Sequence, residues 1–182
     1  MTLLTVGHGT LPADELARLV GGAGIELVVD IRSFPTSRRH PQFRREAMEL
    51  WLPDAGVEYR WEPRLGGRRK ERPGSPHAAL RVSGFRGYAD HMETAEFSDA
   101  LDDVLVDADR RRTAVMCAES VWWRCHRRLL ADAAVLLRGA AVEHLFHDGR
   151  LRPHPTTPEA RVEARRIIYD GGEATLPLRE ST

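Results

Sequence analysis

The chain has 182 residues, enough for one domain with a substantial core but too few for two comfortable domains. Its 27 Lys and Arg residues balance its 27 Asp and Glu residues, which excludes a global basic charge that would draw the whole surface to nucleic acid or anionic lipid. With no apolar run near the roughly 20 residues of a membrane helix and no charged leader, the sequence predicts a cytoplasmic protein, without a membrane partner, whose two cysteines form no disulfide framework.

Short apolar runs typical of strands alternate with helical patterns along the chain. Strands are expected over 3–6, 27–31, 57–61, 114–116 and 142–146, and helices over 12–20, 41–51, 97–105 and 129–137. The run Leu27-Val28-Val29 is continuously apolar, as in a parallel strand that is covered on both faces. The alternation therefore predicts an α/β fold: a single domain with a mostly parallel sheet of about five strands, flanked by helices on both faces.

Two segments depart from this alternation. Residues 63–84 form a loop of about 20 residues, a length that usually indicates function or mobility. This loop carries a basic cluster around Gly66 and Gly67, formed by Arg64, Arg68, Arg69, Lys70 and Arg72. Residues 159–168 are expected to form a short helix. We accordingly expect residues 1–150 to be the α/β domain that carries the site, and residues 151–182 to be a peripheral C-terminal extension of the same domain.

Polar side chains lie where four of the expected strands end. The residues at these ends are His8, Asp30 with Arg32, Cys117 with Glu119, and His144. In open parallel sheets, ligands bind outside the carboxyl ends of the strands. The sequence therefore predicts a site at this edge. Asp30 and Arg32 are two positions apart on a strand, point to the same face, and can also pair with one another.

The segment from Cys117 to Arg127, CAESVWWRCHR, holds both cysteines of the chain together with Glu119 and His126. Cys117 is expected to end a strand and Cys125 to begin a helix. A thiol at such a junction can meet backbone N–H groups and the positive end of the helix dipole, which favour a thiolate. The alternative is that each cysteine is a small buried hydrophobic residue, which is a frequent role of free cysteine.

Five motifs, in order along residues 3–147, resemble a family catalogued as domain of unknown function 488: TVGHGT, VVDIRSFPTSRRHPQF, YRWEPRLGG, GFRGYADHM and MCAESVWWRCHRRLLA. The resemblance implies a compact α/β domain. It implies no activity, since the name of the family records none. The shared polar positions that it implies are His8, Asp30, Arg32, Pro35, Ser37, Gly66, Gly67, Cys117, Glu119, Cys125, His126 and Arg127.

The first mechanism compatible with these residues is cysteine-dependent group transfer or hydrolysis on a small anionic or nucleotide-like ligand. Cys117 would be the nucleophile, with His8 or His126 as base, and Arg32, Arg124 or Arg127 would hold the anionic group. It requires no cofactor. A phosphatase is not expected, because Val-Trp-Trp replaces the small, glycine-rich centre of the loop that joins cysteine to arginine in that class.

The second mechanism is a metal site, with a metal ion bound by Cys117, Cys125 or His126 and with Glu119 and His8 as further ligand types. The two cysteines are too far apart in sequence for a typical structural zinc site, which leaves a site with three protein ligands and one open position.

A third interpretation is a nucleic-acid or nucleotide-binding module without turnover. It would use the loop from Arg64 to Arg72, the pairs Arg38-Arg39 and Arg44-Arg45, and the tryptophans Trp122 and Trp123. The neutral net charge argues against strong nonspecific DNA binding, although a local basic patch can suffice. The sequence does not define whether the chain is a homo-oligomer.

Overall fold

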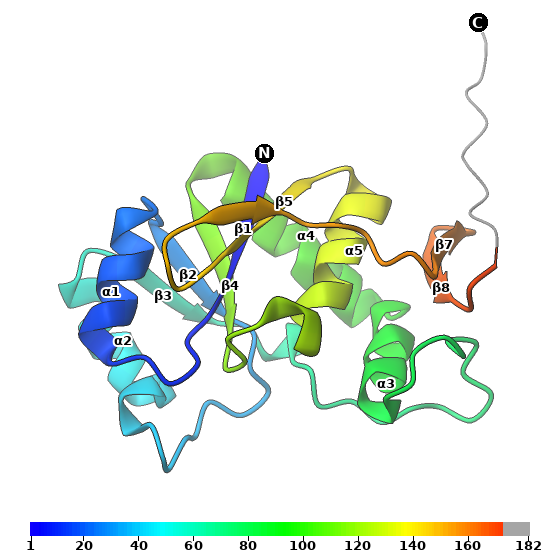
Figure 1. Cartoon of the computed structure of the whole chain (residues 1–182), viewed down its shortest axis with the longest axis horizontal. Coiled ribbons are helices and arrows are strands. Elements are labelled where there is room, and N and C mark those ends of the chain that lie inside the picture. Colours follow the sequence, from blue (N-terminus) through cyan, green and yellow to red (C-terminus); the bar gives the residue numbers. More distant parts are fainter. Residues whose placement is uncertain (173–182) are drawn as a thin grey trace, which may run out of the picture.

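A six-stranded sheet in the order β3-β2-β4-β1-β5-β6 forms the centre of the computed structural model, which describes residues 1–172 (Figure 1). The first five strands are parallel and β6 is antiparallel to β5. The strands are β1 (Thr2–Gly7), β2 (Leu27–Asp30), β3 (Glu58–Trp61), β4 (Thr113–Cys117), β5 (Ala141–Leu145) and β6 (Leu151–Pro153). The predicted single-domain α/β fold is confirmed, and all five expected strands are present.

Helices cover both faces of this sheet. The five helices are α1 (Ala13–Gly22), α2 (Arg45–Asp54), α3 (Ser83–Met92), α4 (Ala95–Arg110) and α5 (Arg127–Arg138). Alternate residues of each strand point to opposite faces. Leu4 and Val28 therefore pack with the buried residues of α1 and α2, whereas Leu3 and Val29 pack with those of α3, α4 and α5. Among the described helices, none is long and apolar enough to cross a membrane.

The prediction of a helix over 159–168 is wrong. The segment forms an antiparallel hairpin of β7 (Ala160–Glu163) and β8 (Arg166–Tyr169). Its two turn residues, Ala164 and Arg165, both have positive φ, and they lack the Asn-Gly or Asp-Gly signature of such turns. Burial of Tyr169 against the core, where its hydroxyl donates to Asp132, provides the tertiary contact that overrides the local pattern. The rest of the expected extension, residues 173–182, lies outside the described residues.

The segment expected to be one loop over 63–84 begins with a 3-10 turn, Pro63–Leu65, and ends in the first turn of α3. The sequence pattern missed this helix because two glycines, Gly84 and Gly87, lower its helical propensity. Gly87 is required by packing, since a Cβ atom there would lie 2.5 Å from the carbonyl oxygen of Arg69. The close approach holds the arginine-containing loop against α3.

His144, expected at the sheet edge with the site, instead belongs to a buried hydrogen-bond chain. Its Nδ1 lies 2.7 Å from the Thr5 hydroxyl, and its Nε2 lies 2.9 Å from His154 Nδ1. His154 continues to Asp132 on α5, with 3.0 Å between Nε2 and Oδ1. Trp122 stacks on the His144 ring at 4.2 Å between centroids. The chain joins β1, β5, α5 and the segment after β6, so the role of His144 in the described structure is to connect these elements.

We expect the fold to lose stability as the pH falls from about 7 to about 5, in part because of His144. Burial, and then the charge of His154, lower the pKa of His144 to about 3. The unfolded chain therefore binds a proton that the folded chain does not, and stability falls as the pH drops below about 6.5. His144→Gln should reduce this loss by about 2 kcal/mol in chemical denaturation at the two pH values.

Candidate functional site

A pocket of about 480 Å³ opens at the carboxyl edge of the sheet, between the ends of β2 and β4 and the beginning of α3. Register explains the meeting of these segments, because Asp30 of β2 pairs with Met116 of β4, one residue before Cys117. The pocket is lined by Arg32, Ser33, Phe34, Gly67, Arg68, Val82, Gly84, Phe85, Cys117, Ala118, Glu119, Arg124, Cys125 and His126.

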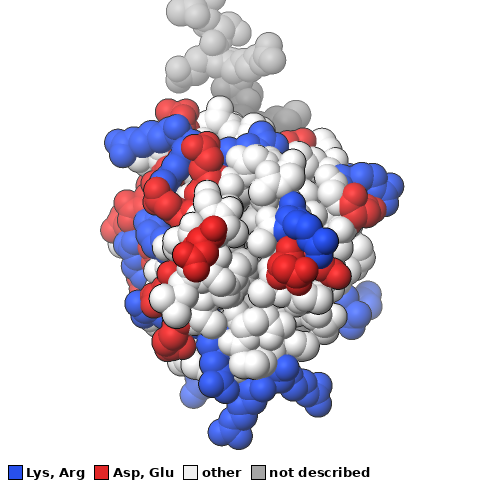
Figure 2. All heavy atoms as spheres, turned by 90° about the vertical axis from the view of Figure 1, so that its left-hand side faces the viewer, with Lys and Arg blue, Asp and Glu red and all other residues white. Residues whose placement is uncertain are grey.

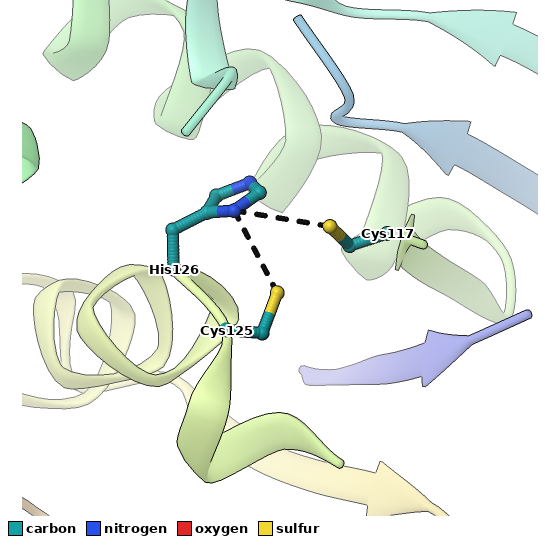
Figure 3. A group of neighbouring side chains, drawn as sticks. All are labelled: Cys117, Cys125 and His126. Atoms are coloured by element: carbon teal, nitrogen blue, oxygen red, sulfur yellow. Dashed lines mark hydrogen bonds between the residues drawn. The ribbon is translucent and has the colours of Figure 1, made fainter. Parts of the chain in front are cut away.

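Both cysteines and His126 meet in the wall of this pocket (Figure 3). His126 Nδ1 lies 3.8 Å from Cys117 Sγ and 3.6 Å from Cys125 Sγ. The three atoms all lie within 4.8 Å of one another, and the thiols are 8% and 4% exposed. Tetrahedral zinc with ordinary Zn–S and Zn–N bonds separates its sulfur and nitrogen ligands by about 3.6 Å. The group has the residue types and spacing of a three-ligand metal site.

The orientation of the His126 ring is set by its other nitrogen. Nε2 lies 3.2 Å from the carbonyl oxygen of Ile31, which can only accept a hydrogen bond. A neutral ring therefore carries its proton on Nε2 and directs the Nδ1 lone pair at the two sulfur atoms. Histidine ligands of metals are commonly oriented by such a bond to a backbone carbonyl. Gly67 packs on the same ring, since a Cβ atom there would lie 2.3 Å from Nδ1.

The two thiols differ in acidity without a metal. The hydrogen bond with Cys125, together with burial, raises the pKa of Cys117 well above its usual value. Burial also opposes ionisation of Cys125, but the hydrogen bond from Cys117 and the neighbouring His126 lower the pKa of Cys125 well below its usual value. The surroundings thus favour ionisation of Cys125 over that of Cys117, whereas the position at the strand end had favoured Cys117.

Cys125 precedes α5 and does not begin it. It is extended and lies between the 3-10 turn Trp122–Arg124 and α5. The fully buried Arg127 holds the preceding loop, because its Nη2 donates to the carbonyl oxygens of Glu119 and Ser120. Within residues 1–172, Arg127 pairs with no carboxylate, so its positive charge is available to favour thiolates at the nearby cysteines.

Arg32 and Asp30 form a buried, two-point ion pair beside the pocket. Arg32 donates from Nε to Asp30 Oδ1 at 2.8 Å and from Nη2 to Oδ2 at 2.5 Å, and the Tyr59 hydroxyl donates to Oδ2 at 2.7 Å. The pairing of Asp30 with Arg32, one of the alternatives from the sequence, is thus what the structure contains. It presents Arg32 to the pocket as a fixed group with its charge largely balanced.

His8 supports this ion pair from behind. Its Nδ1 donates to the Gly9 carbonyl at 2.9 Å, so Nε2 accepts from Arg32 Nη1 at 3.2 Å. The ring is buried and stacks on Phe43 at 4.0 Å between centroids. Burial, and then the charge of Arg32, lower the pKa of His8 to about 4. His8 does not line the pocket, and its contacts orient Arg32.

The structure thus brings together seven of the twelve residues singled out for chemistry or binding. Those that line the pocket are Arg32, Gly67, Cys117, Glu119, Arg124, Cys125 and His126. The other five do not line it: His8, Asp30, Ser37, Gly66 and Arg127. The Ser37 hydroxyl accepts from the backbone N–H of His40, and Gly66 allows close approach of Ser33, whose Oγ would lie 2.4 Å from a Cβ atom.

Sequence reasoning missed other residues of the pocket wall: Ser33, Phe34, Val82, Gly84 and Phe85. The last three belong to or precede α3, which was not expected as a helix. Phe34 is 67% exposed. Its position directly after Asp-Ile-Arg-Ser, at the end of a strand, could have identified it as a residue of the site. Ser33 Oγ accepts from the backbone N–H of Arg68 at 3.2 Å and connects the loops after β2 and β3.

Most of the arginines in the loop over 63–84, and Trp122, make contacts within the fold that the nucleic-acid-binding hypothesis did not anticipate. Arg64 pairs with Glu62 and Asp103, and Arg72 pairs with Asp90 and Glu93, so these charges are neutralised within the fold. Arg69 lies 3.9 Å from Glu96. Trp122 is half-buried and stacks on the buried His144, whereas Trp123 is 47% exposed. Of the arginines in this loop, only Arg68 lines the pocket.

Comparison with known proteins returned one family. The model described as "Domain of unknown function DUF488" matches residues 12–134. No curated protein and no solved structure matches the chain.

Removal of one partner of the buried Asp30–Arg32 pair should destabilise the fold. Asp30→Asn leaves the Arg32 guanidinium buried without its counter-charge, and we expect a loss of about 3 kcal/mol in the free energy of unfolding, measured by urea denaturation. Asp14→Asn removes one partner of the exposed pair with Arg18 and should change stability little. Equal effects of the two substitutions would show that the buried pair does not contribute as described.

Proposed function

We propose that this chain, which belongs to the DUF488 family, is a metal-dependent enzyme. In this proposal Cys117, Cys125 and His126 bind one zinc ion beside the pocket. The observation that carries the proposal is the position of His126 Nδ1, which faces both sulfur atoms at 3.6 and 3.8 Å while Nε2 is held by Ile31. Two thiolates and a neutral imidazole suit zinc by charge and ligand type.

The number of ligand residues supports a catalytic zinc site and not a structural one. Three protein ligands with one open position are typical of catalytic zinc, whereas structural zinc is closed by four. All three ligands line a pocket of about 480 Å³, large enough for a small-molecule substrate. When bound, zinc supplies a Lewis acid and a coordinated water of lowered pKa, which suits hydrolysis or group transfer.

The side chains around the metal position would carry the remaining tasks. Glu119 is the one carboxylate on the pocket wall and would act as proton acceptor and donor. Arg124 and Arg68 would bind an anionic group of the substrate, and Arg32, held by Asp30, would orient it. The substrate class that this arrangement favours is anionic or nucleotide-like. Because two free cysteines are typical of a reducing compartment, we also propose a cytoplasmic location.

A second candidate is thiol-dependent group transfer without a metal, and the lowered pKa of Cys125 favours it. In that mechanism His126 Nδ1 would take the proton of the Cys125 thiol, and the sulfur would bond to the transferred group as the bond to the leaving group breaks. The proton would pass to the leaving group, and water or an acceptor hydroxyl would then displace the group from the sulfur. The two candidates make opposite predictions about whether a chelator changes the reactivity of the thiols.

The zinc proposal predicts about one zinc ion per chain in protein purified without chelators, measured by plasma mass spectrometry. Cys125→Ser and His126→Ala should each lose most of the metal, because two ligands with one open position bind far less tightly. His40→Ala removes a histidine outside the site and should retain the metal. If the folded wild-type protein contains no zinc even after dialysis against zinc, the proposal is wrong.

Alkylation with iodoacetamide separates the two candidates. In zinc-loaded protein both thiols should be protected, since a metal-bound thiolate is a poor nucleophile towards the reagent. After removal of the metal, Cys125 should react before Cys117 at neutral pH, because its pKa is lowered and that of Cys117 is raised. Rates that are unaffected by zinc or chelator would favour the metal-free thiol mechanism. Faster reaction of Cys117 would contradict the assignment of the thiolate.

A further inference from the structure

The segment after β2 carries an unbalanced positive charge. Residues 31–45 contain five arginines and no acidic residue, in a chain whose total charges cancel. Arg38, Arg39 and Arg44 are exposed, and within residues 1–172 none of them forms an ion pair. Figure 2 shows a group of basic side chains at the bottom of the molecule, where Figure 1 places this segment, with no acidic side chain among them in that view.

Two further arginines without an acidic partner lie at the mouth of the pocket. Arg68 and Arg124 line the pocket, are exposed, and pair with no carboxylate in the part of the chain that the structure describes. By contrast, the neighbouring Arg64 and Arg72 are neutralised by acidic partners. Five exposed arginines without an acidic partner among the described residues thus lie on the segments that follow β2, β3 and β4, at the carboxyl edge of the sheet, whereas others, such as Arg110 and Arg152, lie elsewhere.

An exposed aromatic ring lies at the same mouth. Phe34 lines the pocket with 67% of its surface exposed, and the Arg68 guanidinium lies over its ring at 5.9 Å from the centroid. Burial of this ring in the fold would be the ordinary outcome for phenylalanine. A planar ring beside unpaired arginines is the combination on which nucleic-acid bases stack while their phosphates are neutralised.

We propose that the substrate of this site is single-stranded nucleic acid. The reaction on this substrate rests on the proposed function, whereas its binding does not depend on the metal. The phosphates lie along Arg38, Arg39 and Arg44, one base stacks on Phe34, and the reacting nucleotide enters between Arg68 and Arg124. A free nucleotide is too small to use Arg38, Arg39 and Arg44, none of which lines the pocket. A duplex does not fit, because the cysteines are only 8% and 4% exposed and a paired base cannot reach them.

The test is fluorescence anisotropy with a labelled single-stranded DNA 12-mer of mixed sequence, the RNA of the same sequence, and the matching DNA duplex, using the full chain loaded with zinc. We expect a single strand to bind more tightly than the duplex. For about four phosphate contacts, the logarithm of affinity should fall against the logarithm of salt with a slope of about −3. Phe34→Ala should weaken binding about fivefold with little change in that slope, because stacking does not depend on salt.

The matched variants are Arg39→Glu and Arg110→Glu, which change the net charge equally. Arg110 is exposed at the end of α4, beside the amino end of β4 and thus at the opposite edge of the sheet. We expect Arg39→Glu to weaken binding about tenfold at low salt and to make the salt slope shallower, while Arg110→Glu changes neither. Equal loss in both variants would show that binding is nonspecific and would overturn the inference.

Zinc content, measured on the same samples, separates this inference from the proposed function. If wild-type protein holds zinc but binds no single strand, the inference fails and the metal site stands. If it binds single strands through Arg39 but holds no zinc, the binding surface stands and the proposed function fails. Binding of the duplex as tightly as the single strand would also overturn the inference.

Discussion

The hydrogen bond from His126 Nε2 to the carbonyl oxygen of Ile31 connects the two segments on which the site depends. One segment follows β2 and carries Arg32, and the other lies between β4 and α5 and carries both cysteines. Since the bond places the imidazole proton on Nε2, it leaves Nδ1 as an acceptor directed at two sulfur atoms. Without it the ring could rotate or change tautomer, and the three side chains would no longer present ligands to one point.

Two buried arginines near this hydrogen bond differ in whether a carboxylate balances their charge. Arg32 has its counter-charge in Asp30, so its guanidinium is fixed and nearly neutralised. Arg127 is equally buried, yet in the described part of the chain it meets only backbone carbonyls. Its uncompensated charge lies near the cysteines and favours their ionised form, which both metal binding and thiol chemistry require. The arrangement therefore supports thiolates whichever of the two mechanisms operates.

The sequence predicted the framework of the fold, and it directed attention to the sheet edge at which the pocket opens. Continuous apolar runs such as Leu27-Val28-Val29 report directly on burial, and residues at strand ends are brought together by the parallel topology. It could not predict features that depend on contacts distant in sequence. The tautomer of His126 follows from Ile31, the hairpin of β7 and β8 from the burial of Tyr169, and the balance of Arg64 and Arg72 from acids on α3, α4 and the segment after β3. Helix α3 was missed because it contains Gly84 and Gly87, and its packing against the preceding loop requires the second of these.

X-ray absorption at the zinc edge of the loaded, full-length protein tests the central claim most directly, because it reports the ligands of the metal rather than its presence. The account predicts two sulfur neighbours at about 2.3 Å and two nitrogen or oxygen neighbours at about 2.0 Å, one of them exchangeable with solvent. Cys117→Ser should remove one sulfur neighbour. A spectrum with no sulfur neighbour, or one that is the same in the wild-type protein and in Cys117→Ser, would contradict the assignment of Cys117, Cys125 and His126 as the metal ligands.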